Sequence, residues 1–340
     1  MISDKLRGFE SNRSYVLEPS MQGKTLNIEI TGKCNEECIY CEYSALGLHK
    51  TGKDIEPGLF YKVTSEAKEM GITDIGLYIT GEPFMNPYLN DYVCYLKKEL
   101  QIPYVYISTN GIACTPKRLE EIVKAGIDSI KFSISGGNVK SFLQHHGRNA
   151  FQQVLDNVKY AFQCRLKNNL DYKLYMFSVI TQYNINEKEE IRDIFGAYTD
   201  EIVFLDAIAS PYVKGSKEYL EVSGMGFEHN KQSVIPCPQL FERIVVNEDG
   251  YLCACCMSTR TGYTIIEDLN NISLKEAYYG NAMTKVRQLH IDNLINGTIC
   301  ENCVFHKKGQ VTGLNPEFSS KWMSNIDCDI TDEIKRRFGL

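Results

Sequence analysis

The sequence lacks the features that would place the chain in a membrane, in a secretory pathway or on nucleic acid. No apolar stretch approaches the length of a membrane span, and residues 1–10 contain no apolar segment of a signal peptide. The net charge is −6 and no basic run occurs, so the electrostatic footprint of a nucleic-acid-binding protein is absent. We therefore expect a soluble cytoplasmic protein with no membrane and no nucleic-acid partner.

Cysteine, in contrast, is abundant, with 13 among 340 residues. In a chain without a secretion signal, this number indicates metal ligation rather than disulfides. Cys34, Cys38 and Cys41 follow a β-like run, and their spacing puts three thiolates on one short loop. A tetrahedral zinc site would need a fourth ligand, whereas a 4Fe–4S cluster held by three thiolates leaves one iron open to a further ligand. The alternatives are a zinc site and three unrelated structural cysteines.

Apolar β-like runs alternate with segments of helical periodicity. The predicted strands cover residues 25–31, 72–79, 102–107, 127–134, 173–180 and 202–208, and a helical segment lies between each consecutive pair. This βα repeat predicts parallel strands joined by right-handed crossovers. Because a closed barrel of this type needs eight such units, we expect an α/β fold with a partial, TIM-like (β/α)6 barrel.

Polar and turn-forming residues follow the predicted strands, and function in βα barrels collects at this end. After the cysteine loop, these segments are Thr80-Gly81-Glu82-Pro83, Ser108-Thr109-Asn110-Gly111, Ser133 to Gly137, Thr181-Gln182 and Asp206. Each segment alone is explained as an ordinary turn. Together on one rim they predict a site, with Asp206 as a possible substrate contact.

The cysteine loop resembles the C-x3-C-x2-C motif of the radical S-adenosylmethionine (radical SAM) enzymes, with the aromatic Tyr40 before the last cysteine. The resemblance implies that the open iron binds SAM, and that reductive cleavage of SAM gives a 5′-deoxyadenosyl radical. Thr80-Gly81-Glu82-Pro83 resembles the family's Gly-Gly-Glu-Pro motif, with threonine in place of the first glycine. In relatives this motif receives the SAM ammonium, so Glu82 is the first expected contact.

Further SAM contacts are implied by the same resemblance. Ser133 and Ser135 are similar to ribose or carboxylate contacts, and Asn110 to a polar residue that faces SAM. Arg148 resembles an arginine that pairs with the SAM carboxylate, a geometry that a guanidinium suits. A solvated arginine at a helix start is the alternative for Arg148. For His145 and His146 we expect an exposed polar loop without a role.

A second cysteine pattern occupies the C-terminal half. A β-hairpin is predicted around Asp249-Gly250, followed by a helix that Ser273 caps. The hairpin and helix could bring together four thiolates, those of Cys237, Cys255, Cys300 and Cys303. This pattern resembles the short, twitch form of the SPASM domain, which implies one auxiliary 4Fe–4S cluster. A zinc ribbon is the alternative.

The resemblance divides the chain into four parts. We expect an N-terminal extension (1–24), the barrel (25–210), a small β-hairpin-plus-helix iron–sulfur domain (236–308) and a C-terminal tail (309–340). Cys253 and Cys256 flank the predicted ligand Cys255 and are possible hydrogen donors to a substrate radical. On a continued strand, Cys253 would share the side of Cys255 while Cys256 would face away. A small buried hydrophobe is the simpler explanation for either thiol.

Twitch relatives include 2-deoxy-scyllo-inosamine dehydrogenase, which oxidises a secondary alcohol of an aminocyclitol. We therefore expect oxidation of a carbohydrate or aminocyclitol alcohol, with the auxiliary cluster as electron acceptor and a flavodoxin or ferredoxin as reductant. One alternative is an epimerase or decarboxylase of a sugar or nucleotide sugar. A peptide maturase, for which we would expect an added N-terminal leader-binding domain, and a non-catalytic electron carrier are the others.

Overall fold

The computed structural model of the protein describes residues 15–45, 52–181, 183–206, 236–256, 259, 264–295 and 300. Within them, one sheet has the strand order β6-β5-β4-β3-β2-β1-β7-β8-β9. Its strands are β1 (Thr25–Ile28), β2 (Asp74–Gly76), β3 (Tyr104–Thr109), β4 (Ser129–Ser133), β5 (Lys173–Ile180), β6 (Glu201–Asp206), β7 (Arg243–Val246), β8 (Tyr251–Cys253) and β9 (Ile265–Asp268). Pairing is parallel from β6 through β7 and antiparallel beyond it.

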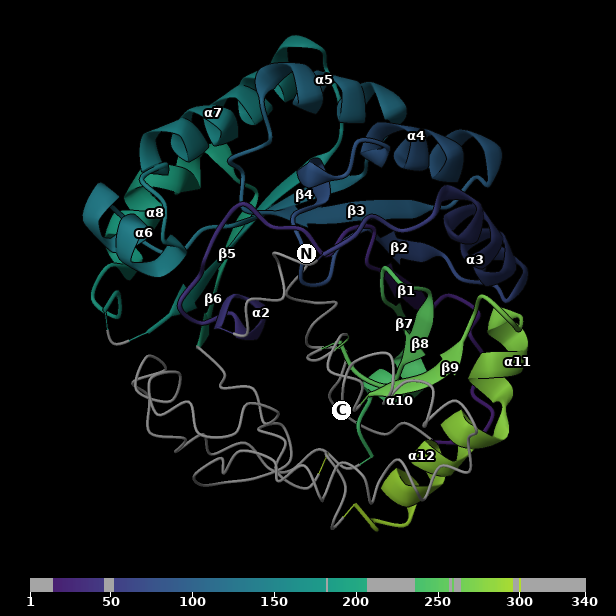
Figure 1. Ribbon diagram of the computed structural model, residues 1–340. Coiled ribbons are helices and arrows are strands. Elements are labelled where there is room, and N and C mark those ends of the chain that lie inside the picture. Colours follow the sequence, from purple (N-terminus) through teal and green to yellow (C-terminus); the bar gives the residue numbers. More distant parts are fainter. Residues whose placement is uncertain are drawn as a thin grey trace.

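Helices cover the outer face of this sheet, which curves around an inner lumen in Figure 1. The helices of the barrel are α2 (Glu42–Ala45), α3 (Pro57–Glu69), α4 (Leu89–Cys94) with a π-helical turn (Tyr95–Glu99), α5 (Pro116–Ala125), α6 (Val139–His146), α7 (Phe151–Lys167) and α8 (Lys188–Phe195). Short 3-10 turns occupy Pro83–Met85 and Gly196–Tyr198. The fold is the predicted partial α/β barrel, and no described helix has the length and apolar character needed to cross a membrane.

Alternation along the strands separates the two faces of the sheet. In β3, Val105 and Ile107 are fully buried in the main core, whereas Tyr104 and Tyr106 are half-buried on the other face. Successive side chains of a strand point to opposite faces, so the tyrosines lie on the lumen side. The lumen is consequently lined by polar and aromatic groups, and the hydrophobic core lies between sheet and helices.

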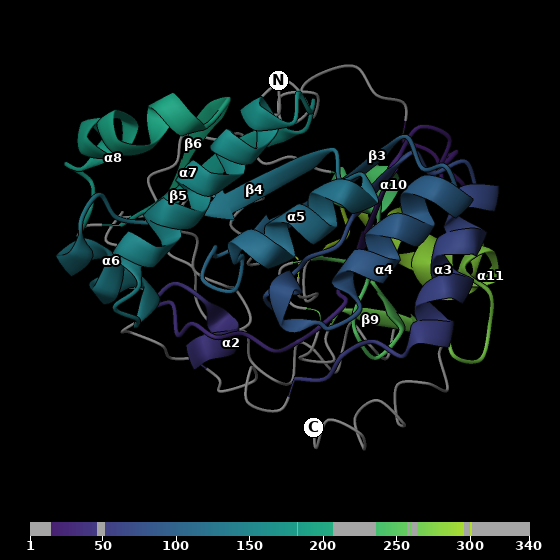
Figure 2. The same cartoon turned by 90° about the horizontal axis from the view of Figure 1, so that it is seen from above.

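Residues 139–146 form α6, and the prediction of an exposed polar loop around the two histidines is wrong. Asn138 and Ser141 form a capping box at its start, and Gly147 ends it with φ of 67°. His145 and His146 are buried, with relative exposures of 0% and 1%. Figure 2 shows α6 close to the cysteine-loop side of the barrel, near α2.

The predicted hairpin exists, but it is not a separate sheet. β7 pairs with β1 in parallel, so the hairpin extends the barrel sheet on the side opposite β6. Gly250 makes the turn with φ of 87°. Four short elements complete this part of the molecule: β9, α10 (Gln239–Glu242), α11 (Leu274–Tyr279) and α12 (Asn281–Ile291). The predicted capping by Ser273 is confirmed, since its side chain accepts from the Glu276 N–H.

Candidate functional site

A cavity of about 440 Å³ lies where the strands of the barrel end. Ten of the residues predicted from the sequence are on its wall: Cys34, Cys38, Tyr40, Cys41, Thr80, Gly81, Glu82, Asn110, Ser133 and Cys256. A cavity of about 490 Å³ between α5 and α7 is lined by none of the predicted residues. The residue types on its wall, rather than its volume, therefore identify the cavity of about 440 Å³ as the candidate site.

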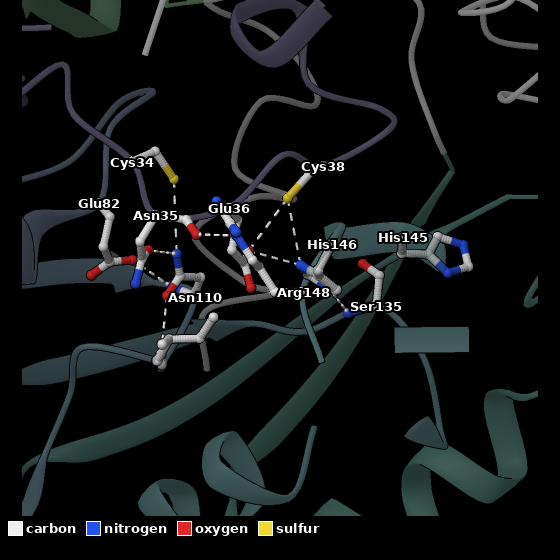
Figure 3. Close-up of polar contacts among 12 residues, drawn as sticks. Cys34, Asn35, Glu36, Cys38, Glu82, Asn110, Ser135, His145, His146 and Arg148 are labelled. Atoms are coloured by element: carbon white, nitrogen blue, oxygen red, sulfur yellow. Dashed lines mark hydrogen bonds and ion pairs between the residues drawn. The ribbon is translucent and has the colours of Figure 1, made fainter. Parts of the chain in front are cut away.

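Helix α6 holds the cysteine loop through main-chain and side-chain contacts. The carbonyls of His146 and His145 accept from the N–H groups of Glu37 (3.1 Å) and Ile39 (2.9 Å). The His146 ring faces Glu36 and Cys38, with Nδ1 2.8 Å from Glu36 Oε2 and 3.4 Å from Cys38 Sγ, whereas His145 points away (Figure 3). α6 is thus a support for the loop.

The tautomer of His146 follows from its contacts. Nε2 lies 2.9 Å from the Ser135 main-chain nitrogen, which can only donate. Nε2 is therefore the acceptor, and Nδ1 carries the proton that is donated toward Glu36 and Cys38. A neutral histidine of fixed orientation thus presents an N–H to the cysteine loop.

The three cysteines fit an iron–sulfur cluster. No disulfide joins the described cysteines. Burial, together with Glu82 and Glu36, raises the pKa of Cys34 to about 12, and burial raises that of Cys38 well above its ordinary value. Electrostatic repulsion from the other thiols of the loop also contributes to raising the pKa values of Cys34 and Cys38. Without a cation these thiols keep their protons, and a bound metal would compensate the buried thiolates. The three cysteines are partly buried on one cavity wall, and three neighbouring thiols of this kind are the donor set of such a cluster.

Glu82 is placed to receive a cation in the cavity. It is 2% exposed and accepts from Thr109 Oγ1 (2.7 Å), the Asn110 N–H (2.7 Å) and the Phe84 N–H (3.1 Å). An ionised carboxylate offers about four acceptor positions, so about one remains open. Burial raises the pKa of Glu82 to about 7, and the three hydrogen bonds oppose this rise. A positive group would stabilise the ionised form.

Glu29, which sequence reasoning missed, connects three segments of the site. One carboxylate oxygen accepts from the Thr80 N–H (3.0 Å), the Thr80 hydroxyl and the Gly81 N–H (3.2 Å). The other accepts from the Thr259 hydroxyl at 3.0 Å. The Thr259 N–H in turn donates to the Tyr43 hydroxyl at 2.6 Å, beside the cysteine loop. The hydroxyl of Thr80, where the family motif has glycine, therefore has a defined partner.

Gly81 is required by packing. A Cβ at this position would overlap the main-chain carbonyl of Thr31, and the adjacent Glu82 N–H donates to the Lys33 carbonyl at 2.8 Å. The Thr80–Pro83 segment consequently lies directly against the chain that leads into the cysteine loop. Pro83 is buried and starts a 3-10 turn without reaching the cavity wall.

The remaining predicted SAM contacts differ in position. Asn110 lines the cavity and its Nδ2 donates to Asn35 Oδ1 at 2.7 Å. Ser133 lines the cavity, whereas Ser135 is fully buried behind it and hydrogen-bonds to the Tyr40 hydroxyl at 3.1 Å. Arg148 lies outside the cavity wall with half of its side chain exposed, and its Nε donates to the Asn35 carbonyl at 2.9 Å. These contacts give Arg148 a place beside the cysteine loop and no direct support as a SAM contact.

The second cysteine group is described in part. Cys237, Cys255 and Cys300 are half-buried, and Cys303 lies outside the described residues. β8 ends at Cys253, so the strand alternation predicted for the following residues does not apply. Cys256 instead packs against the hydrophobic cluster that contains Cys253, beside Val245 and Tyr251, and its thiol hydrogen-bonds with the thiol of Cys255. The prediction that Cys256 faces away from Cys255 is therefore wrong.

The two spare thiols differ in access. Cys253 is 2% exposed, and burial raises its pKa well above the ordinary value. Cys256 lines the cavity, and a hydrogen bond with the Cys255 thiol and the Arg243 guanidinium lower its pKa to about 6 against the effect of burial. Only Cys256 of this pair is on the cavity wall. Asp206 ends β6 opposite Ile180, and its role stays a prediction.

Comparison with known proteins agrees with this geometry. Residues 28–195 match the radical SAM superfamily model, and residues 237–304 match the SPASM model, an iron–sulfur cluster-binding domain. The chain is a radical SAM protein with a C-terminal SPASM domain. Its cofactors are accordingly SAM with a 4Fe–4S cluster, and an auxiliary iron–sulfur centre in the second domain.

The individual relatives are distant. The GTP 3′,8-cyclase of Clostridium acetobutylicum is 28% identical over 142 residues, 42% of this chain and 44% of that protein. A probable GTP 3′,8-cyclase of Methanococcus maripaludis is 29% identical over 138 residues, 35% of this chain and 43% of that protein. The chain therefore spans less than half the length of these curated relatives.

Two solved structures share the fold. BtrN in complex with AdoMet and 2-DOIA has a TM-score of 0.54 at 16% identity, covering 83% of this chain and 92% of that chain. Streptococcus suis SuiB bound to precursor peptide SuiA has a TM-score of 0.62 at 14% identity, covering 92% of this chain and 79% of that chain. At such identities the likeness shows the fold alone.

Proposed function

We propose that the protein is a radical SAM oxidoreductase that oxidises an alcohol of a small polar substrate, a carbohydrate or an aminocyclitol. The observation that carries this proposal is the cavity whose wall combines the cysteine loop, Glu82 and Cys256. Residues of both matched domains thus meet at one space. A substrate bound there would lie between the SAM site and the second cysteine group.

The residues divide the task between them. Cys34, Cys38 and Cys41 would hold the first cluster, and Cys237, Cys255, Cys300 and Cys303 the second. When bound, SAM with the reduced first cluster supplies a hydrogen-abstracting radical, and the second cluster supplies a one-electron acceptor. Glu82 would bind the SAM ammonium, while α6 and Glu29 keep the surrounding loops in place. The substrate would lose a hydrogen atom to that radical, its hydroxyl proton to a base or solvent water, and one electron to the second cluster, which converts the alcohol to a ketone.

A reductant must deliver electrons to the first cluster, and a flavodoxin or ferredoxin would serve. The proposal is tested with the iron-loaded protein, SAM, dithionite and a panel of neutral sugars, sugar phosphates and aminocyclitols. Oxidation predicts equal amounts of ketone and 5′-deoxyadenosine from one panel member. A Cys164→Ala variant is the matched control, because this buried cysteine of α7 lies away from the cavity. SAM cleavage coupled to a product other than a ketone would contradict the oxidation.

Epimerisation is the second candidate, and Cys256 on the cavity wall is the observation that favours it. Its thiol would give a hydrogen atom to the substrate radical, leaving a thiyl radical that an external reductant must reduce again. Oxidation would need no such repair of a thiol, because the second cluster would take the electron, and this keeps oxidation first. Turnover in deuterated water separates the two. Incorporation of deuterium at the reacting carbon by the wild type, and its absence in Cys256→Ala, would establish epimerisation. Oxidation predicts a ketone product that contains no deuterium at that carbon.

A further inference from the structure

The lumen of the barrel contains a lysine whose charge is met by aromatic rings. Lys131 lies in β4 between Ile130 and Phe132, which are fully buried on the helix side of the sheet. Its own side chain therefore points to the lumen. Nζ lies 4.5 Å from the ring centroid of Tyr78 and 4.5 Å from that of Phe177.

The two rings contact the Lys131 ammonium without accepting a hydrogen bond from its N–H groups. In the part of the chain that the structure describes, Lys131 has no ion pair and no hydrogen bond, only the two ring contacts. Lys97, at a comparable depth, donates to the Ile102 carbonyl at 3.0 Å and to the Asp128 carboxylate at 2.8 Å. An ammonium has three N–H groups, and a cation–π contact balances its charge without accepting from them.

A second cation, Arg243 of β7, lies near the same place. Burial alone would raise the pKa of Tyr78, but Lys131 and Arg243 together lower it below the ordinary value. Arg243 Nη1 donates to Gln239 Oε1 at 3.5 Å, and Gln239 Nε2 in turn donates to Cys256 Sγ at 3.5 Å. Tyr78 and Cys256 are both on the cavity wall.

The buried acids around the cavity are occupied elsewhere. Glu29 accepts from Thr80 and Thr259, Glu36 from His146, and Glu82 from Asn110. These carboxylates lie at the loops that follow the strands, whereas Lys131 and Arg243 lie within strands. The cavity wall thus has acidic groups toward the SAM-binding loops, whereas Lys131 lies behind the wall, against the Tyr78 ring.

We propose that the Tyr78 side of the cavity is an oxyanion-binding subsite, where Lys131, assisted by Arg243, binds a phosphate or carboxylate group of the substrate. The inference rests on the proposed function, because it places the substrate in the same cavity. It narrows the substrate class to an anionic carbohydrate, such as a sugar phosphate, a nucleotide sugar or a sugar acid. An aminocyclitol would bring its ammonium next to two cations and is disfavoured.

Anion binding is measured on the iron-loaded, SAM-bound protein with two probes, inorganic phosphate and carbon-labelled acetate. Saturable broadening of their phosphorus and carbon NMR signals, at ionic strength held constant with chloride, gives the affinity of each. Losing a hydrogen bond to a charged group predicts that Lys131→Met weakens binding by about tenfold or more. Lys131→Arg should retain binding, as should Lys140→Met, the control on the exposed face of α6. The probe with the higher affinity tells phosphate from carboxylate.

Absence of saturable binding of either anion to the wild-type protein would overturn the subsite, as would unchanged affinity in Lys131→Met. Lys131→Gln is the second charge-removing variant should the methionine variant fail to fold. Release of 5′-deoxyadenosine is measured in the same wild-type samples. Failure of SAM cleavage would refute the proposed function while anion binding stands, and the reverse result would refute only the subsite.

Discussion

Glu82→Gln should weaken SAM binding strongly while leaving cluster assembly intact. The substitution keeps one oxygen, which can accept from Thr109 and Phe84 as Oε1 does, but it replaces Oε2, the acceptor of the Asn110 N–H, with an amide group and removes the charge that faces the cavity. A hydrogen bond to a charged group contributes about 1.5–3 kcal/mol, which corresponds to a loss of about tenfold to a hundredfold in affinity. Iron content should not change, because Glu82 is not a cluster ligand in this account.

The pH dependence provides a second, independent signature. Burial raises the pKa of Glu82 to about 7, so the carboxylate takes up a proton as the pH falls through this value. The protonated form cannot pair with the SAM ammonium, and binding should weaken by up to about tenfold for each pH unit below 7. Above pH 8 the affinity of the wild-type protein should level off. Glu82→Gln has no such group and should show a flat profile over the same range.

Equilibrium dialysis of SAM against the anaerobic, iron-loaded protein between pH 5.5 and 8.5 measures both effects. Glu69→Gln, an exposed acid of α3, is the matched control and should behave as the wild type. Equal affinities for wild type and Glu82→Gln at pH 8 would refute the assignment of Glu82. A wild-type pH dependence that persists unchanged in Glu82→Gln would show that another group is responsible.

Three further predictions concern the clusters and the loops that support them. Anaerobic reconstitution should load about eight irons per chain, for two four-iron clusters, and stoichiometric zinc would contradict the auxiliary cluster. His146→Phe should lower iron loading at the first site, because it removes the N–H directed at Glu36 and Cys38. Gln144→Ala, on the exposed side of α6, is the control and should load iron as the wild type does. Equal iron content and an equal EPR signal in His146→Phe would refute a supporting role of His146. Thr80→Val and Thr259→Val should each weaken SAM binding by up to about tenfold with unchanged iron content, since each loses one hydrogen bond to Glu29, and wild-type affinity in both would contradict the connection.

The regular part of the fold could be predicted from local sequence alone. Periodicity gave β5 its full extent, Lys173–Ile180, and Thr115, Pro116 and Gly126 mark the ends of α5. Helix α6 was missed because its histidines look polar in sequence. They are buried through contacts with distant residues, His145 Nε2 with Thr181 Oγ1 at 2.8 Å and His146 with Glu36.

The candidate site was predictable where a residue's role depends on a motif, and not where it depends on long-range contact. The cysteine loop and Glu82 were found by spacing and lie on one cavity wall. Glu29 and Thr259 are 230 positions apart and meet only because β7 pairs with β1. Lys131 was missed for the same reason, since one aromatic neighbour follows β2 and the other lies in β5.

Dithionite-driven release of 5′-deoxyadenosine from SAM is the decisive measurement for the cysteine loop as a SAM-cleaving centre. We expect release by the iron-loaded wild type, and none by the variant in which Cys34, Cys38 and Cys41 are all alanine. Cys300→Ala should retain at least part of the release, because that residue belongs to the second cysteine group. Cys94→Ala, a half-buried cysteine outside the cavity wall, is the control and should match the wild type. Equal release from the triple variant, or none from the wild type with its iron loaded, would show that the cysteine loop is not the SAM-cleaving centre.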